Sequence, residues 1–233
     1  MLKVAVFDGD KIVAFSSKES DDLSGIWDLL AQYQPDKGIL SSVTNENGLL
    51  INALKDKLSC FVWIDEATRF PIHVEYKTVS SLGRDRIAAV VGAQYLQPAR
   101  HALVIDAGTA ITYELLEASG AYKGGNISPG LTTRFRSLNL FTERLPLVKE
   151  QASVPLIGTS TKSAILAGVV NGIIFEMDGY IDAMKSRYED IFVFLTGGHA
   201  FYFEKRLKNY IFAAPNLVLI GLNRILEYNA KED

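Results

Sequence analysis

The feature that most constrains the fold of this chain is a plan of secondary structure that occurs twice. Each half opens with strands joined by tight turns, "KVAVFDGDKIVAF" from Lys3 and "HALVIDAGTAITYELLEASGAYKGGNIS" from His101. Helices and strands then alternate in both halves, with apolar residues at the matching spacing. This duplication predicts two α/β subdomains with a cleft between them. We expect the first to cover residues 1–98 and the second residues 99–233.

Several elements can be assigned within this plan. The "DGD" at residues 8–10 predicts a hairpin turn with its glycine at positive φ. In the second half we expect helices over residues 131–145, 161–188 and 201–207. The short apolar run "LVLIG" at residues 217–221 is interpreted as a strand that precedes a C-terminal helix.

Composition restricts the class of protein. The 233 residues are 48% hydrophobic, which is enough for a sizeable core. A net charge of −3 gives no basic surface for nucleic acid, and the three histidines show no metal-ligand spacing. Cys60 is the only cysteine, which excludes an internal disulfide or a cysteine metal cluster. Without 18 consecutive apolar residues or a signal-peptide pattern, we expect a cytoplasmic protein with no membrane span.

Two strand ends that carry glycine are candidates for nucleotide binding. Asp106, Gly108 and Thr109 follow an apolar run; the glycine admits a phosphate to the backbone, the hydroxyl can donate, and the carboxylate can hold a cation. The same residues are ordinary in hairpin turns, and taken alone they favour that structural role. In "TGGHA", Gly197 and Gly198 end a buried strand, where a nucleotide contact and a plain tight connection are equally good interpretations.

The stretch "SLGRDR" at residues 81–86 is a candidate for acid–base chemistry. Asp85 lies between two arginines, which favour its ionised form, and an ionised carboxylate in a cleft can take a proton from an alcohol during phosphoryl transfer. Arg86 could bind a carboxylate or a phosphate in a bidentate pair. Without further context, a helix N-terminus with Asp85 in its first turn is the better interpretation.

Together these pieces resemble one family. The ordered segments "YKTVSSLGRDR", "VIDAGTAITYE", "GGNISPGL", "GTSTKSAILAG", "LTGG" and "LVLIGLNRIL" are similar to those of type III pantothenate kinases, over nearly the whole chain. The resemblance implies the duplicated actin-like, ribonuclease H-like fold of the acetate and sugar kinase superfamily. It implies transfer of the γ-phosphate of ATP to the primary hydroxyl of pantothenate, the first step toward coenzyme A. It also implies Mg²⁺, a monovalent cation (K⁺ or NH₄⁺) and a homodimer whose partner helps to close the substrate site.

The resemblance also implies roles for individual residues. Asp106, Gly108 and Thr109 match the second phosphate motif of the family, with Asp106 near the monovalent cation, and Gly197 and Gly198 match its adenosine motif. Asp85 matches the general base. The substrate-side positions are Tyr76, Gly83, Arg86 and Thr161, with Arg86 suited to the carboxylate of pantothenate. Gly124, Gly125 and the "SPG" that follows resemble structural turns.

One segment departs from the family pattern. The family begins with a strand that ends in Asp-x-Gly-Asn-Thr, its first phosphate motif, whereas this chain opens at "MLKVAVFDGD" with Lys3 in the place just after that motif. We therefore expect the motif immediately upstream of Met1 and the missing strand to be a central one. A chain without it is expected to be a poor kinase, because that loop positions Mg·ATP.

Two other functions remain open at this point. One is a nucleotide- or pantothenate-binding regulatory protein on the same fold, similar to accessory factors of transcription, which has lost phosphoryl transfer. The other is a nucleotide hydrolase without a pantothenate site. The missing motif favours the first, whereas the retained Asp85, Arg86 and Asp106 favour a kinase.

Overall fold

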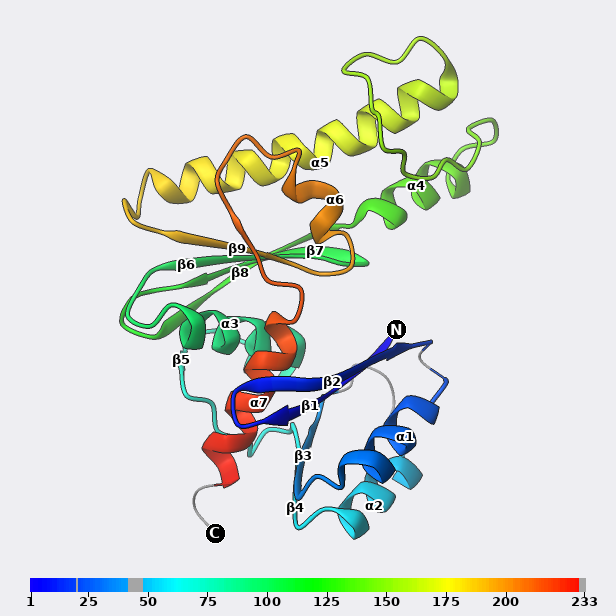
Figure 1. The fold of residues 1–233 in the computed structure, drawn as a ribbon. Coiled ribbons are helices and arrows are strands. Elements are labelled where there is room, and N and C mark those ends of the chain that lie inside the picture. Colours follow the sequence, from blue (N-terminus) through cyan, green and yellow to red (C-terminus); the bar gives the residue numbers. More distant parts are fainter. Residues whose placement is uncertain (20, 42–47, 231–233) are drawn as a thin grey trace. The chain divides into compact units, whose positions relative to one another are not determined.

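The structure is a computed structural model and describes residues 1–19, 21–41 and 48–230 (Figure 1). The chain divides into two compact units, each of which is described by itself. Unit 1 comprises residues 1–96 and 216–233, and unit 2 comprises residues 97–215. We expected residues 99–233 to form a single subdomain, but the C-terminal helix belongs to unit 1 because it packs closely on a helix of that unit.

Unit 1 contains two pairs of strands and the helices that flank them. β1 (Leu2–Asp8) and β2 (Lys11–Lys18) are antiparallel, and Gly9 in their turn has a φ of +57°, as predicted. β3 (Lys37–Leu40) and β4 (Cys60–Trp63) are parallel. The other elements are α1 (Ser24–Tyr33), α2 (Gly48–Lys57), β5 (His73–Val74), the 3₁₀ turn η1 (Val79–Ser81), α3 (Arg84–Leu96) and α7 (Leu217–Asn229).

The stretch "LVLIG" opens α7 and is not a strand, so this prediction was wrong. A five-residue apolar run does not distinguish a strand from a buried helix segment. The spacing of buried residues along the whole segment indicates the helix, because Leu217, Gly221 and Ile225 recur every four positions and are all buried. This spacing puts them on one face of a helix, and that face packs against α3.

Unit 2 is built on a continuous sheet. Its strands lie in the order β10 (Phe212–Ala213), β9 (Phe192–Thr196), β6 (Ala102–Ala107), β7 (Ala110–Leu116) and β8 (Ala121–Pro129). β6 is antiparallel to β7 and parallel to β9. α5 (Thr161–Lys185) lies along one face of this sheet (Figure 1), and its Val170, Ile173 and Met177 are fully buried in the core with Ile105 of β6.

Two shorter helices complete unit 2, α4 (Leu131–Leu140) and α6 (Ala200–Glu204). We expected α4 to continue to residue 145. It ends at Leu140, where the hydroxyl of Thr142 donates to the Leu138 carbonyl oxygen at 2.6 Å. Pro146 then disfavours helical backbone at the residue before it.

The two units share one strand pattern, which confirms the predicted duplicated α/β fold. The antiparallel pair β1–β2 corresponds to β7–β8, and the parallel pair β3–β4 corresponds to β9–β10. In unit 2, β6 joins the two pairs into one sheet. In the part of unit 1 that the structure describes, no strand joins β1 to β3 in this way. The sheet of unit 1 is therefore split into two pairs.

The long helix α5 is the core helix of unit 2. By length and composition its 25 residues could also cross a membrane. Half of its most apolar window is buried within the unit, however, and its apolar side chains pack against the sheet. The expectation that the chain has no membrane span stays a prediction.

Candidate functional site

Residues of the "SLGRDR" segment gather at the start of α3 in unit 1. Arg86 is 7% exposed, and its guanidinium carbon lies 5.5 Å from the centre of the Tyr76 ring, a cation–π arrangement. Gly83 precedes the helix, and a Cβ there would lie 2.6 Å from Oδ1 of Asp85. Four predicted site residues, Tyr76, Gly83, Asp85 and Arg86, are thus close together.

Asp85 is exposed in the first turn of α3. Its Oδ1 accepts a hydrogen bond from the backbone N–H of Arg86 at 2.9 Å. This is the structural role that the sequence favoured, because a carboxylate in the first turn interacts favourably with the partial positive charge at the helix N-terminus. Oδ2 of Asp85 takes no part in this hydrogen bond. The structural role of Asp85 is therefore compatible with proton transfer to its carboxylate.

The two glycine-bearing strand ends lie side by side in unit 2. β6 and β9 are parallel neighbours, and Asp106 pairs in register with Thr196 on one side and with Thr112 of β7 on the other. Residues in register on adjacent strands present their side chains on the same face. The side chains of Asp106, Thr112 and Thr196 therefore share one face of the sheet. They lie beside the carboxyl ends of the parallel strands β6 and β9, where α/β folds bind ligands.

The turn after β9 lies directly against Asp106. Gly197 has a φ of +96°, and a Cβ on it would lie 2.4 Å from Oδ1 of Asp106 and 2.7 Å from the backbone nitrogen of Ala107. The backbone N–H of His199 donates to the Ala107 carbonyl oxygen at 3.0 Å. The two turns are thus in contact, although about 90 residues separate them in sequence. Together they contain Asp106, Gly108, Gly197 and Gly198.

The turn at Gly108–Thr109 is also held by the start of α4, which sequence reasoning did not assign to the site. The Thr109 carbonyl oxygen accepts from the backbone N–H of Gly130 at 3.0 Å and from the Thr133 hydroxyl at 2.7 Å. A Cβ on Gly130 would lie 2.2 Å from the Gly108 carbonyl oxygen. The glycine of "SPG", assigned to a structural turn, is therefore packed against the candidate phosphate turn.

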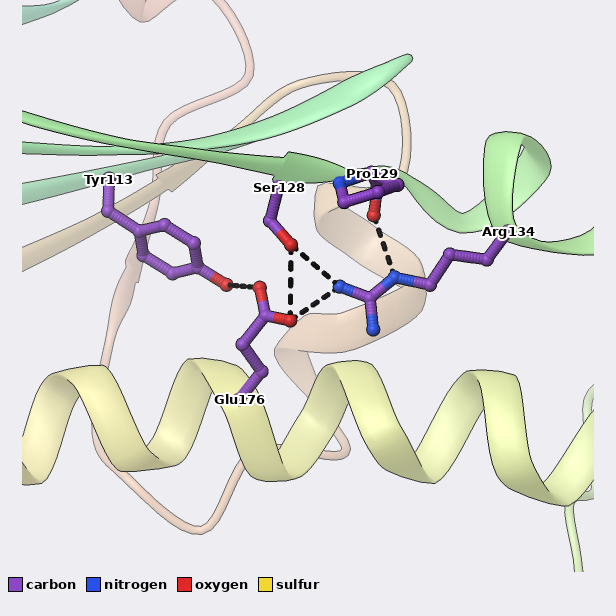
Figure 2. Close-up of polar contacts among 5 residues, drawn as sticks. All are labelled: Tyr113, Ser128, Pro129, Arg134 and Glu176. Atoms are coloured by element: carbon purple, nitrogen blue, oxygen red, sulfur yellow. Dashed lines mark hydrogen bonds and ion pairs between the residues drawn. The ribbon is translucent and has the colours of Figure 1, made fainter. Parts of the chain in front are cut away.

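A polar cluster ties this part of α4 to α5 (Figure 2). Arg134 donates from Nε to the Pro129 carbonyl oxygen at 2.8 Å, and from one guanidinium nitrogen to both Ser128 and Glu176. Glu176 also accepts from the Tyr113 hydroxyl at 2.7 Å. Burial alone would raise the pKa of Glu176, but the hydrogen bonds from Arg134 and Tyr113 outweigh it and lower that pKa. Burial and the bond to Glu176 raise the pKa of Tyr113, so Tyr113 stays a neutral donor.

The last predicted residue, Thr161, belongs to neither group. It is the exposed first residue of α5, which begins with a capping box between Ser160 and Ser163. Among the described residues, no three His, Cys, Asp or Glu side chains gather in a way that could hold a metal ion by themselves. A cation at Asp106 would therefore also need hydroxyl, backbone, water or phosphate oxygens as ligands.

The comparisons of sequence identify one family. The chain matches the family model of type III pantothenate kinases over residues 1–183. It is 44% identical over 229 residues to a type III pantothenate kinase of Phocaeicola vulgatus, with 98% of this chain and 95% of that one covered. It is 42% identical over 231 residues to a type III pantothenate kinase of Cytophaga hutchinsonii, with 98% and 95% covered.

A solved structure supports the fold. The structure of a Baf family transcriptional activator from Campylobacter jejuni matches with a TM-score of 0.59 and 22% identity, covering 88% of each chain. At this identity the likeness concerns the fold alone. The family model and the near-complete matches at more than 40% identity confirm the family predicted from the sequence motifs. This chain belongs to the type III pantothenate kinase family.

Proposed function

We propose that the protein transfers the γ-phosphoryl group of ATP to the primary hydroxyl of pantothenate, forming 4′-phosphopantothenate and ADP in the first step of coenzyme A biosynthesis. The observation that carries this proposal is the match to type III pantothenate kinases over 95% of a relative's length. The geometry of unit 2 supports the nucleotide half, and that of unit 1 supports the acceptor half.

The phosphate groups of ATP are assigned to the turn at Gly108–Thr109. Backbone N–H groups of a glycine turn can approach phosphate oxygens closely, and the exposed Thr109 adds a hydroxyl donor. The adenosine is assigned to Gly197 and Gly198, which lie at the neighbouring strand end. These assignments are supported by the closeness of the two turns, which would let one nucleotide contact both.

Deprotonation of the acceptor is assigned to Asp85. As the pantothenate hydroxyl oxygen attacks the γ-phosphorus, the bond from phosphorus to the bridging oxygen of ADP breaks and Asp85 takes the hydroxyl proton. Arg86 would bind the pantothenate carboxylate, with Tyr76 beside its guanidinium and Gly83 leaving room before the helix. Thr161 is proposed as a further substrate contact.

Asp106 is proposed to hold a monovalent cation, K⁺ or NH₄⁺, and Mg²⁺ is proposed to arrive with ATP. The fit of a cation is supported by the side-chain oxygens of Asp106, Thr112 and Thr196, which lie in register on one face of the sheet. When bound, Mg²⁺ supplies neutralisation of charge on the transferring phosphate oxygens. The chain itself contributes the carboxylate of Asp106 and the backbone N–H groups of the turn at Gly108–Thr109.

Pantothenate-dependent release of ADP tests the proposed reaction. With ATP and Mg²⁺ present, a coupled assay is expected to show ADP only after pantothenate is added, and a higher rate in K⁺ than in Na⁺ at equal ionic strength. Release without pantothenate would indicate a hydrolase, and no release would favour the regulatory protein. Equal rates in K⁺ and Na⁺ would contradict a specific monovalent site.

We also propose a homodimer in the cytoplasm, where ATP is available. Large apolar side chains are exposed near the start of α5 and at the end of α4, namely Leu140, Phe141, Leu156 and Ile157, which are 70–81% exposed. Leu156 and Ile157 lie within five residues of Thr161. A second copy that covers these side chains would therefore also lie against the substrate position at Thr161.

Replacing Ile157 by aspartate tests the dimer surface. The wild-type protein is expected to sediment as a dimer, and Ile157→Asp is expected to shift it to a monomer with lower pantothenate-dependent activity. Leu49→Asp is the matched control, because Leu49 is 85% exposed in unit 1 and lies away from α5 in sequence. Sedimentation velocity measures the outcome, and a fully active wild-type monomer would contradict the proposal.

A further inference from the structure

The turn at Gly108–Thr109, called the phosphate turn from here on, is contacted by residues at the start of α4. Thr109 is exposed in the two-residue turn between β6 and β7, which the backbone N–H of Gly108 closes by donating to the Ala110 carbonyl oxygen at 2.9 Å. The Thr109 carbonyl oxygen is held by two donors, the N–H of Gly130 and the hydroxyl of Thr133. Both donors come from the junction between β8 and α4.

That junction is itself held by Arg134. The backbone N–H of Arg134 donates to the Gly130 carbonyl oxygen at 2.9 Å, and its Nε donates to the Pro129 carbonyl oxygen at 2.8 Å. One of its guanidinium nitrogens reaches the Ser128 hydroxyl at 2.9 Å. Arg134 therefore binds three successive residues, 128–130, of which the last touches the phosphate turn.

The side chain of Arg134 is in turn fixed by α5 (Figure 2). Its ion pair with Glu176 is mostly sheltered, with side-chain exposures of 21% and 24%. Glu176 also accepts from the hydroxyls of Tyr113 and Ser128. An ion pair that is shielded from water and fixed at both ends restricts an arginine more firmly than an exposed pair would.

We propose that Arg134, anchored by Glu176, is a positioning residue for the phosphate turn, which it holds through residues 128–130 and Thr133. The inference rests on the proposed binding of ATP phosphates at Gly108–Thr109. It predicts that weakening the α4–α5 cluster lowers affinity for ATP and leaves affinity for pantothenate unchanged. Tyr76, Gly83 and Arg86 lie in the other unit. Thr161 stands 15 residues before Glu176 on α5, which is ~22 Å along a helix axis.

Three variants test the inference. Thr133→Val removes only the hydroxyl that binds the Thr109 carbonyl. Arg134→Lys keeps a positive charge for Glu176 but loses the forked donors to residues 128 and 129. Glu176→Gln removes the charge that fixes Arg134. Each is expected to raise KM for ATP about 3- to 10-fold, the usual range for one or two lost hydrogen bonds, with KM for pantothenate unchanged.

The control is Asp182→Asn, which breaks another ion pair of α5. Asp182 pairs with Lys208 at 2.7 Å and has no contact with residues 128–134 among the contacts described. Its KM for ATP should match the wild type. The double variant Thr133→Val/Glu176→Gln should show less than the product of the single effects, because both act on the same turn.

The outcomes separate the inference from the proposed function. Pantothenate-dependent ADP release by the wild type, together with equilibrium binding of ATP, tests the function by itself. If the wild type is active and the three variants keep a normal KM for ATP, positioning by Arg134 is overturned. Equal rises in both KM values, or a fall in melting temperature that matches the loss of activity, would show a merely structural cluster and would also overturn it.

Discussion

Replacing Asp85 by asparagine is expected to lower kcat by ~10²–10⁴-fold, the usual contribution of a general base. The amide keeps the shape of the side chain and an oxygen that can accept from the Arg86 N–H, now 2.9 Å away. It cannot take the proton of the pantothenate hydroxyl. The start of α3 should therefore persist while the chemical step slows.

Binding and stability measurements separate this effect from misfolding. Loss of one charge in the first helical turn costs only about 0.3–1 kcal/mol in stability, and ATP is assigned to unit 2, so its dissociation constant should change little. Asp28→Asn is the matched control, because Asp28 is an exposed acidic residue on α1 with no assigned role. Near-normal turnover of Asp85→Asn would remove Asp85 from the role of base.

The fold was predictable where the sequence repeats a pattern. The two strand–turn–strand openings and the period of α5 are local signals, and they predicted the strands and the core helix that the structure contains. Where a pattern was short, the interpretation failed. The run "LVLIG" is as apolar as a strand, and five residues carry no signal of the packing against Ala88 and Gly92 of α3 that they make as part of a helix.

The site was predictable only in part, because most of its contacts join distant segments. Asp106 and Gly197 each carry a local signal, a strand end followed by glycine. No such signal marks Glu176, which lies on the core helix 42 residues after Arg134. Thr133 stands three residues after Gly130, in the first turn of α4. This position alone is a weak signal for a contact with the phosphate turn. Such a residue is recognised only once the turn and the helix are placed together.

The crossing of α3 and α7 should be the most sensitive packing feature of unit 1. The two helices meet backbone to backbone, with Gly92 facing the Leu217 carbonyl and Gly221 facing the Ala88 carbonyl. This closeness matters for the site because α3 carries Asp85 and the buried Arg86 at its first turn. Any side chain at the crossing must push α7 away from that helix.

Gly221→Ala is therefore expected to destabilise the protein by ~1–3 kcal/mol, the usual cost of overpacking, and to lower the melting temperature by roughly 3–10 °C for a chain of this size. The cause is a Cβ only 1.7 Å from the Ala88 carbonyl oxygen, which backbone atoms cannot avoid without separating the helices. Gly168→Ala is the matched control, because Gly168 lies in the interior of α5 with nothing within 4 Å of its added Cβ. There the better helix propensity of alanine should stabilise by about 0.5–1 kcal/mol. Thermal unfolding followed by circular dichroism measures both, and an unchanged melting temperature for Gly221→Ala would show that the helices are not in this contact.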